Sequence, residues 1–261
     1  MAEKLTVLIP CRNESQNIRE CIESVRDIAD EILVADSLST DDTLDIVRRL
    51  GGCRIIEREF VDHADFKNWA IPQASHPWVL VVDADERMSP KLAAEIREAL
   101  ARENPLLDAY RMRRDNFFLG YPIRHCGWNT ATIIRLFRRD ACRYGEAKVH
   151  EKMEVQPDRI GSLRGKLVHY TCDSLDRWME KTNRYTTVMA EEKHAAGHWT
   201  CGAGILGISL VRFIHLYIIR GGFLDGTAGL IVCISSAFYT FSKHAKLWQL
   251  NHAKTLQKNR S

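Results

Sequence analysis

The sequence predicts an α/β fold, in which a mostly parallel sheet flanked by helices is followed by a helical C-terminal extension. Strand-like and helix-like segments alternate with short connections in the amino-terminal part of the chain. A short apolar run over 78–82, typical of a buried strand, ends in Asp83-Ala84-Asp85. After residue 200 the chain changes to long apolar stretches.

The first two predicted strands each lead into a helix. The run over 5–10 is rich in β-branched residues and ends at a proline, and Asn13 is expected to cap the helix that follows. The run over 31–36 is the second strand and ends in Asp36. Apolar residues at helical spacing form the buried stripes of the two helices, Ile18, Ile22 and Val25 in the first and Leu44, Val47 and Leu50 in the second.

The alternation continues as far as the acidic triplet. Residues 53–57 are the third predicted strand, 64–74 a helix, and 78–82 the fourth strand. Ser89-Pro90 opens a further helix, since proline is tolerated at the first helical position. Short connections between such units are typical of parallel strands with helices on both faces.

Carboxylates follow two of the predicted parallel strands, Asp36 after one and Asp83 and Asp85 after another. Open α/β sheets bind ligands at the carboxyl ends of their strands, so these side chains are expected at one ligand-binding edge. Carboxylate oxygens suit Mg²⁺ or Mn²⁺ and, through the cation, a diphosphate. An isolated D-x-D is more often a solvated acidic turn, but the preceding strands and helices favour the cation site. No glycine-rich dinucleotide or P-loop motif follows the first strand.

Three motifs stand in order along the first half of the chain. They are Val7-Leu8-Ile9-Pro10-Cys11-Arg12-Asn13-Glu14, Val34-Ala35-Asp36-Ser37-Leu38-Ser39-Thr40-Asp41-Asp42-Thr43 and Val82-Asp83-Ala84-Asp85-Glu86. They resemble the motifs of family 2 glycosyltransferases, which are inverting, metal-dependent enzymes of the GT-A (Rossmann-like) fold that use nucleotide-diphosphate sugars. The resemblance covers about the first 170 residues.

Four further segments resemble the bacterial lipopolysaccharide-core β-1,4-glucosyltransferase branch of that family. They are Phe66-Lys67-Asn68, Asn116-Phe117-Phe118-Leu119-Gly120, Val149-His150-Glu151-Lys152 and Gly222-Phe223-Leu224-Asp225-Gly226. The resemblance implies a GT-A domain over 1–172, with a nucleotide-sugar half over 1–105 and an acceptor half over 106–172. A helical region over 173–261 follows.

The resemblance also implies roles at the strand ends. Asp83 would contact the ribose, Asp85 the metal, Asp36 the uracil-type base, and Lys67 the base or the phosphates. For Asp36 the alternative is a helix or turn cap, and for Lys67 a solvated helix face.

Three residues of the first motif would border the nucleotide sugar, namely Pro10, Arg12 and Glu14. Arg12 departs from the family pattern, because many members carry an aromatic residue at that position.

The catalytic base must be a carboxylate or histidine on the acceptor side. Glu151 is the candidate, because it lies where the family places its acidic base, and Asp115 is the reserve. The alternative for Glu151 is a surface ion pair with Lys152 or Arg159. His169, at the end of a predicted strand, is a candidate metal or phosphate ligand, although a lone histidine there is more often only hydrogen-bonded.

Composition indicates where the protein works and what it binds. The chain of 261 residues has eight cysteines without a C-x-x-C pair, and no signal peptide is evident, which predicts a reduced cytoplasmic compartment and no structural zinc. The segment 111–143 has eight arginines, no lysine and two aspartates. It is either a solvated strand face or a binder of phosphate or carboxylate, and nucleic acid is disfavoured because nucleic-acid motifs are lacking.

The apolar stretches 203–219 and 226–242 are broken or bounded by charges. Cationic and aromatic flanks favour helices that lie at a membrane surface, on the cytoplasmic face of the inner membrane. A buried helical hairpin and a true span are the alternatives, the second disfavoured by length.

The resemblance implies an inverting transfer of a hexose, with glucose expected, from a UDP-sugar to a glycolipid or lipopolysaccharide-core acceptor with Mg²⁺ or Mn²⁺. A sugar nucleotidyltransferase is one alternative, disfavoured because the first strand lacks a glycine-rich loop with a basic residue. An inactive nucleotide-sugar-binding module is another, disfavoured because the acidic residues are all present.

Overall fold

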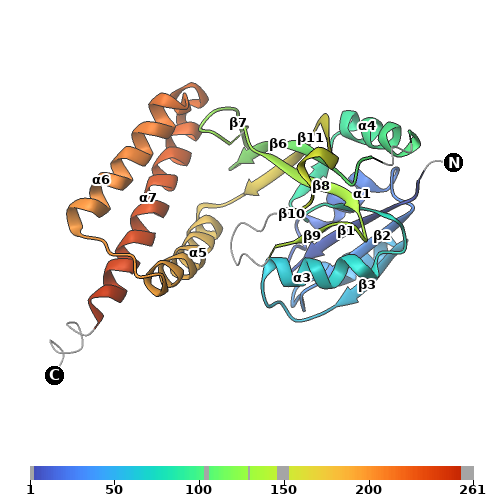
Figure 1. Ribbon diagram of the computed structural model, residues 1–261, viewed down its shortest axis with the longest axis horizontal. Coiled ribbons are helices and arrows are strands. Elements are labelled where there is room, and N and C mark those ends of the chain that lie inside the picture. The colour runs from blue at the N-terminus through green and yellow to red at the C-terminus, as the bar shows by residue number, and fades with distance from the viewer. Residues whose placement is uncertain (1–2, 103–105, 129, 146–152, 254–261) are drawn as a thin grey trace. The chain divides into compact units, whose positions relative to one another are not determined.

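The structure, a computed structural model, describes residues 3–102, 106–128, 130–145 and 153–253. The chain forms two compact units (Figure 1). The first unit comprises 1–115 and 130–170, and the second comprises 116–129 and 171–261. The segment 116–129, which lies within the predicted acceptor half, thus belongs to the same unit as the C-terminal helices.

Four strands form the parallel part of the main sheet, in the order β3-β2-β1-β4. They are β1 (Leu5–Cys11), β2 (Glu31–Asp36), β3 (Cys53–Glu57) and β4 (Trp78–Val81). β1 and β4 are buried almost throughout, which explains why they are continuous apolar runs in the sequence. Their parallel pairing brings the carboxyl ends of β1, β2 and β4 to one edge, as the sequence predicts.

The sheet continues past β4 in the order β8-β6-β11-β5, with β7 paired to β6. β8 pairs antiparallel with both β4 and β6, and β5 with β11. These strands are β5 (Glu86–Met88), β6 (Ala109–Phe118), β7 (Tyr121–Ile123), β8 (Thr132–Arg138) and β11 (Ile160–Cys172). β9 (Arg143–Tyr144) and β10 (Met153–Glu154) form a separate pair, and η2 (Pro157–Arg159) is a short 3₁₀ turn.

Helices cover both faces of the parallel strands (Figure 1). One face packs against α1 (Ile18–Val25), α2 (Thr43–Leu50) and α4 (Pro90–Ala101). The other packs against α3 (His63–Ala70) and the 3₁₀ turn η1 (Ile71–Gln73). The predicted mostly parallel sheet with flanking helices is thus confirmed, with an antiparallel continuation.

The helix predicted to open at Ser89-Pro90 is α4, whose first residue is Pro90, and Ser89 Oγ accepts a hydrogen bond from the N–H of Leu92 (3.3 Å). The expectation that Asn13 caps the first helix is wrong, because α1 begins only at Ile18. Asn13 instead adopts φ 55° and its Oδ1 accepts from the N–H of Thr40 (2.8 Å). Asparagine tolerates this left-handed backbone conformation. Through the bond to Thr40, its side chain braces the loop after β2.

The second unit is helical apart from its strand residues. It contains α5 (Leu175–Ala195), α6 (Gly202–Ile214), the π-helical η3 (His215–Ile219), the 3₁₀ turn η4 (Gly222–Asp225) and α7 (Gly226–Asn251). α7 packs against α5 and α6. A core cluster joins η3 and α7 to the β6–β7 segment through Phe118, Ile123, Cys126, Leu216, Val232 and Cys233.

Two stretches of the second unit, Gly202–Ile219 and Gly222–Asn251, are long and apolar enough to cross a membrane by length and composition. The predicted apolar stretches lie within them. Most large apolar side chains of α6 are exposed, with Leu206 at 67% and Val211 at 65%. This helix therefore presents an apolar face that the described part of the chain does not cover.

Candidate active site

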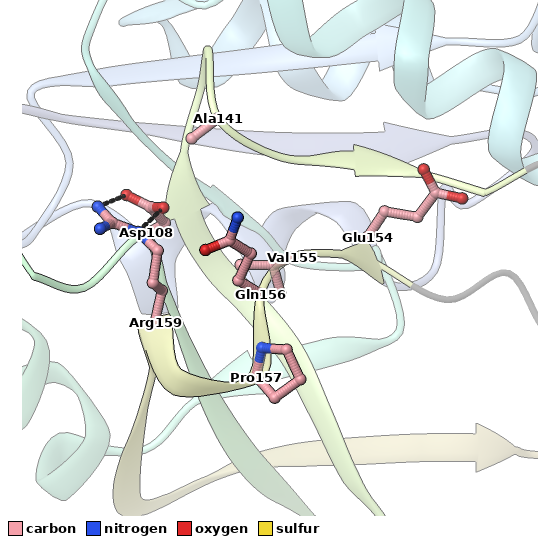
Figure 2. A pocket seen from close by; sticks show the side chains of 7 residues that line it. All are labelled: Asp108, Ala141, Glu154, Val155, Gln156, Pro157 and Arg159. Carbon is pink, nitrogen blue, oxygen red and sulfur yellow. Dashed lines mark hydrogen bonds and ion pairs between the residues drawn. The ribbon is translucent and has the colours of Figure 1, made fainter.

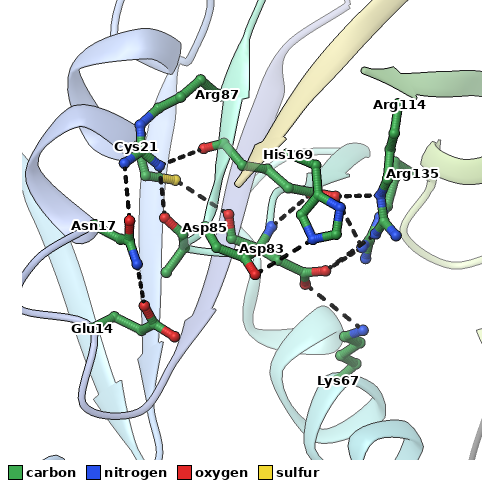
Figure 3. A network of polar contacts seen from close by, with 12 residues as sticks. Glu14, Asn17, Cys21, Lys67, Asp83, Asp85, Arg87, Arg114, Arg135 and His169 are labelled. Carbon is green, nitrogen blue, oxygen red and sulfur yellow. Dashed lines mark hydrogen bonds and ion pairs between the residues drawn. The ribbon is translucent and has the colours of Figure 1, made fainter. Parts of the chain in front are cut away.

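The D-x-D turn after β4, whose Asp83 and Asp85 are labelled in Figure 3, is held by the residue that follows it. Glu86 is fully buried, and its Oε2 accepts a hydrogen bond from the N–H of Asp83 (3.0 Å). The N–H of Glu86 in turn donates to the carbonyl of Asp83 (2.8 Å). The turn is therefore fixed while the side chains of Asp83 and Asp85 stay 30% and 23% exposed, within reach of a ligand.

Strand pairing brings His169 to Asp85. β11 pairs with β5 so that His169 lies opposite Glu86, and the N–H of Tyr170 donates to the carbonyl of Asp85 (2.9 Å). The Nε2 of His169 lies 3.4 Å from Oδ2 of Asp85. Two residues far apart in the sequence, both predicted as metal ligands, therefore share one site.

Three cations surround the Asp83 carboxylate. Arg135 donates to Oδ2, Arg114 Nη2 lies 3.4 Å from the same oxygen, and Lys67 Nζ lies 3.9 Å from Oδ1. Burial raises the pKa of Asp83, but the charges of Arg135, Lys67 and Arg114 outweigh it and hold that pKa well below its usual range. The carboxylate is thus ionised, among donors that also suit phosphate oxygens.

Glu86 also neutralises the two arginines. Its Oε1 lies 2.6 Å from Arg114 Nε and 3.5 Å from Arg135 Nη2. Burial lowers the pKa of Arg135, but Asp83 and Glu86 more than compensate and raise it above its usual value. The sequence reasoning missed all three residues of this group, although Glu86 adjoins the D-x-D and both arginines lie in the arginine-rich segment.

The loops after β1 and β2 brace one another at the same edge. Beyond the Asn13 bond described above, the N–H of Glu14 donates to Thr43 Oγ1 (2.8 Å). Asp36 is fully buried, and its Oδ2 accepts from the N–H of Ser39 (2.7 Å), which is the geometry of the capping alternative. Two further residues of the first motif gather here, Pro10 partly buried and Arg12 exposed.

The remaining predicted residues have different surroundings. The Lys67 side chain is only 8% exposed and its Nζ lies 5.1 Å from the Tyr144 ring centroid, so it is not on a solvated helix face. Asp115, the reserve base, pairs with Lys166 Nζ at 2.5 Å. Glu151, the predicted base, lies outside the described residues.

Most of the arginine-rich segment has internal partners. Besides the two arginines at Asp83, Arg138 pairs with Glu3 (2.9 Å), Arg139 with Asp140 (2.9 Å), and Arg143 donates to backbone carbonyls. The exposed arginines of the segment are Arg111, Arg113 and Arg124. Anion binding therefore stays open for these three exposed arginines and for the two at Asp83, but not for Arg138, Arg139 and Arg143.

An open pocket elsewhere in the first unit is drawn in Figure 2. It is lined by Asp108, Ala141, Glu154, Val155, Gln156, Pro157 and Arg159. The Arg159 guanidinium donates to Asp108 Oδ1 (2.9 Å), so the cation of this pocket is already neutralised. It contains none of the predicted site residues, and we assign it no ligand.

The chemistry at the D-x-D turn fits a divalent cation. Among the described residues there is no group of three or more His, Cys, Asp or Glu side chains that could hold a metal. Asp85 and His169 would therefore be the protein ligands, one oxygen and one nitrogen donor. Mg²⁺ in particular is commonly bound by one or two carboxylates together with substrate phosphates, so two protein ligands suffice.

The mixed sheet and its flanking helices place the chain among proteins of the GT-A fold. Glucosyl-3-phosphoglycerate synthase from Mycobacterium tuberculosis, solved in complex with Mn²⁺, UDP and glucosyl-3-phosphoglycerate, has the same fold with a TM-score of 0.50 and 17% identity, covering 77% of this chain and 82% of that one.

Sequence comparison gives the particular family. Residues 6–165 match Glycosyl transferase family 2, and the chain belongs to this family. The lipopolysaccharide core biosynthesis glycosyltransferase LpsC of Rhizobium meliloti (strain 1021) is 30% identical over 94% of this chain and 92% of its own. An uncharacterised glycosyltransferase of Rickettsia typhi is 27% identical over 95% of this chain and 88% of its own. The chain is thus a glycosyltransferase, as predicted, rather than a nucleotidyltransferase.

Proposed function

We propose that this family 2 glycosyltransferase moves a hexose, with glucose the first to be tested, from a UDP-sugar to an anionic glycolipid acceptor of the lipopolysaccharide-core type, with inversion. The observation that carries the proposal is the pairing of Asp85 with His169 beside an ionised Asp83. The R. meliloti relative, named for lipopolysaccharide core biosynthesis, supports the acceptor class. The mycobacterial synthase, solved with UDP and Mn²⁺, supports the donor and the cation.

The side chains around Asp83 suggest how the donor is held. Asp83 would accept hydrogen bonds from the ribose hydroxyls, while Arg114, Arg135 and Lys67 would donate to the diphosphate. These donors are fixed before the reaction, so they stabilise charge as it develops on the leaving nucleotide. A divalent cation held by Asp85 and His169 would add Lewis-acid neutralisation of the same charge.

The nucleoside would lie along the braced loops, bordered by Pro10, Arg12 and Glu14, while the buried Asp36 holds the turn after β2. For the base, the proposal keeps Glu151 from the sequence alone. Glu151→Gln should leave donor binding intact and lower turnover by at least about 10²-fold, the low end for loss of a general base. Unchanged turnover would pass the role to Asp115.

The donor site is tested by calorimetric titration of UDP with and without Mn²⁺. Asp85→Ala and His169→Ala should each remove the Mn²⁺-dependent part of UDP binding, because each deletes one of two protein ligands. Asp45→Ala, which removes an exposed carboxylate on α2, is the matched control and should bind like the wild type. Release of UDP from UDP-glucose with Mn²⁺ then identifies the donor. An Asp85→Ala variant that binds UDP and Mn²⁺ normally would refute the site.

We also propose that the second unit attaches the enzyme to the cytoplasmic face of the inner membrane, where a glycolipid acceptor lies. The exposed apolar face of α6 supports this proposal, since monomeric soluble proteins rarely leave such a continuous apolar surface in water. The presence of Arg212 and His215 in this stretch favours a helix that lies in the interface over one that spans. Co-sedimentation with vesicles, released only in part by high salt, is the expected behaviour.

A further inference from the structure

The motif Gly222-Phe223-Leu224-Asp225-Gly226 lies in the second unit, outside the donor site. It forms η4 and the start of α7, and its acid is tied to the residues after β7. Both oxygens of Asp225 are used: Oδ2 accepts from the N–H of His125 (2.8 Å), and Oδ1 lies 2.8 Å from the Nδ1 of the same histidine. The Asp225 side chain is only 4% exposed, so these contacts are largely shielded from water on the side of the carboxylate.

Glycines in η4 and in α7 allow these two elements to pack closely. A Cβ on Gly222 would lie 2.6 Å from Cys233 Sγ, and one on Gly229 would lie 2.0 Å from the carbonyl of Gly222. Either contact is far inside van der Waals distance, so only glycine fits at both positions. The turn therefore presses directly on α7 and holds the Asp225–His125 pair in one place.

The pair fixes how the imidazole is presented. Because the carboxylate of Asp225 only accepts hydrogen bonds, Nδ1 of His125 carries a proton and the ring turns its Nε2 the other way. The His125 side chain is 39% exposed. Within the part of the chain that the structure describes, Nε2 takes part in no hydrogen bond or ion pair. The imidazole is therefore held at the surface with Nε2 open to a ligand, and this nitrogen donates to a phosphate oxygen only when the ring is in its imidazolium form.

Arg220 lies against the same loop. Its carbonyl accepts from the N–H of Cys126 (3.2 Å), and its Cγ would be 3.9 Å from a Cβ on Gly127. The side chain is exposed, and so is that of Arg124, which precedes His125. The carboxylate of Asp225 is already occupied by His125, so the two arginines give this corner a net positive charge.

Large apolar side chains surround these cations. Ile219 is 70% exposed, Leu224 62% and Phe223 50%, and they adjoin the apolar face of α6. Binding of a soluble anion would require only the cations and would not account for the exposed apolar side chains. An anionic lipid surface satisfies both features, since acyl chains receive the apolar side chains while headgroup phosphates meet the cations.

We propose that this corner, formed by Arg124, His125, Arg220 and the apolar residues 219, 223 and 224, binds phosphates of anionic phospholipid headgroups, with Asp225 as the positioning residue for His125. The proposal rests on the membrane attachment proposed above and identifies the contact. It assigns the distal glycine-rich motif to lipid binding rather than to the transfer reaction.

Vesicle binding by the full chain tests the proposal, with phosphatidylglycerol–phosphatidylcholine vesicles compared with pure phosphatidylcholine. Arg124→Gln with Arg220→Gln should weaken binding to the anionic vesicles by about 30-fold, since each surface cation contributes about 1 kcal/mol of attraction. Binding to neutral vesicles should change little. Ile219→Ser with Leu224→Ser should weaken binding to both kinds at least about tenfold, because inserted methylene groups are lost. His125→Gln should show a smaller loss, confined to anionic vesicles.

Matched controls come from the first unit. Arg48→Gln removes an exposed arginine of α2, and Val61→Ser an apolar side chain that is 66% exposed. Both should bind vesicles like the wild type, the arginine and apolar variants should keep the wild-type melting temperature, and every variant should keep Mn²⁺-dependent UDP binding. Corner variants that bind vesicles normally, or that lose only self-association in light scattering, would overturn the proposal. If the wild type showed no Mn²⁺-dependent UDP binding, the proposed donor site would be overturned, whereas the vesicle-binding result would be unaffected.

Discussion

Replacement of Glu86 by glutamine should destabilise the first unit strongly, although the two side chains have the same shape. Glu86 is fully buried and its charge offsets Arg114 and Arg135, the second of which is only 6% exposed. Removing one partner of a buried ion pair costs about 3–5 kcal/mol. Asp83 still pairs with both arginines in the variant, so we expect the low end, about 3 kcal/mol, which is about 6–12 °C in melting temperature for a unit of this size.

The assay is urea unfolding at pH 7 followed by circular dichroism, with Glu20→Gln as the control. Glu20 also pairs with an arginine, Arg87, at 2.9 Å, but its side chain is 60% exposed. Its replacement should cost less than about 1 kcal/mol, as for exposed pairs in general. Glu86→Gln should also weaken UDP binding, because the arginines and the N–H of Asp83 lose their anchor. Equal and small losses in the two variants would refute the view that the buried charge organises this site.

Three further predictions concern stability and the acceptor. Burial raises the pKa of Glu31, but hydrogen bonds from neighbouring groups outweigh it and lower that pKa from 4.5 to about 2, so its stabilisation is complete above pH 4.5 and lost as the pH falls through 2. Glu31→Gln should therefore cost about 1–2 kcal/mol at pH 7, after allowance for solvent screening, and nothing near pH 2, measured by urea unfolding at each pH. A Cβ on Gly165 would lie 2.4 Å from the backbone of α4, so Gly165→Ala should cost at least about 2 kcal/mol in a thermal melt, whereas Gly207→Ala on open α6 should be neutral or stabilising. Replacing the exposed Arg111 and Arg113 by glutamine should raise the KM for a phosphorylated acceptor about tenfold, with the affinity for UDP unchanged, and an unchanged KM would exclude them from acceptor binding.

The parallel half of the fold could be predicted from the sequence because its signals are local. Each strand there is a buried apolar run, each helix has an apolar stripe, and the helix after the D-x-D strand has its serine and proline at the start. The antiparallel half could not be predicted in this way, because β5, β8 and β11 come together through strand pairings that no local sequence pattern encodes. The role of Asn13 could not be predicted for the same reason, because its side chain accepts a hydrogen bond from Thr40, in a loop that is distant in the sequence.

The site could be predicted in part for the same reason. Asp83 and Asp85 stand out at a strand end, and His169 was identified although only the pairing of β11 with β5 brings it to Asp85. The two arginines at Asp83 are among the eight arginines of the segment 111–143. Sequence spacing does not distinguish a buried arginine from an exposed one, so these two could not be identified. For Asp36 the sequence left two roles open, and in the structure its oxygens serve the turn.

The second unit is discontinuous, since residues 116–129 complete its core together with 171–261. Phe118, Ile123 and Cys126 are buried against η3 and α7, which a ribosome makes about a hundred residues later at roughly 5–20 residues per second. For several seconds the nascent chain therefore exposes apolar residues of β6 and β7 that have no core to join. A protein truncated near residue 172 would lack the C-terminal helices, so the same apolar surface would stay exposed permanently. Expression of the catalytic domain alone would consequently call for excision of the β7 segment as well, or for a chaperone or detergent to shield it.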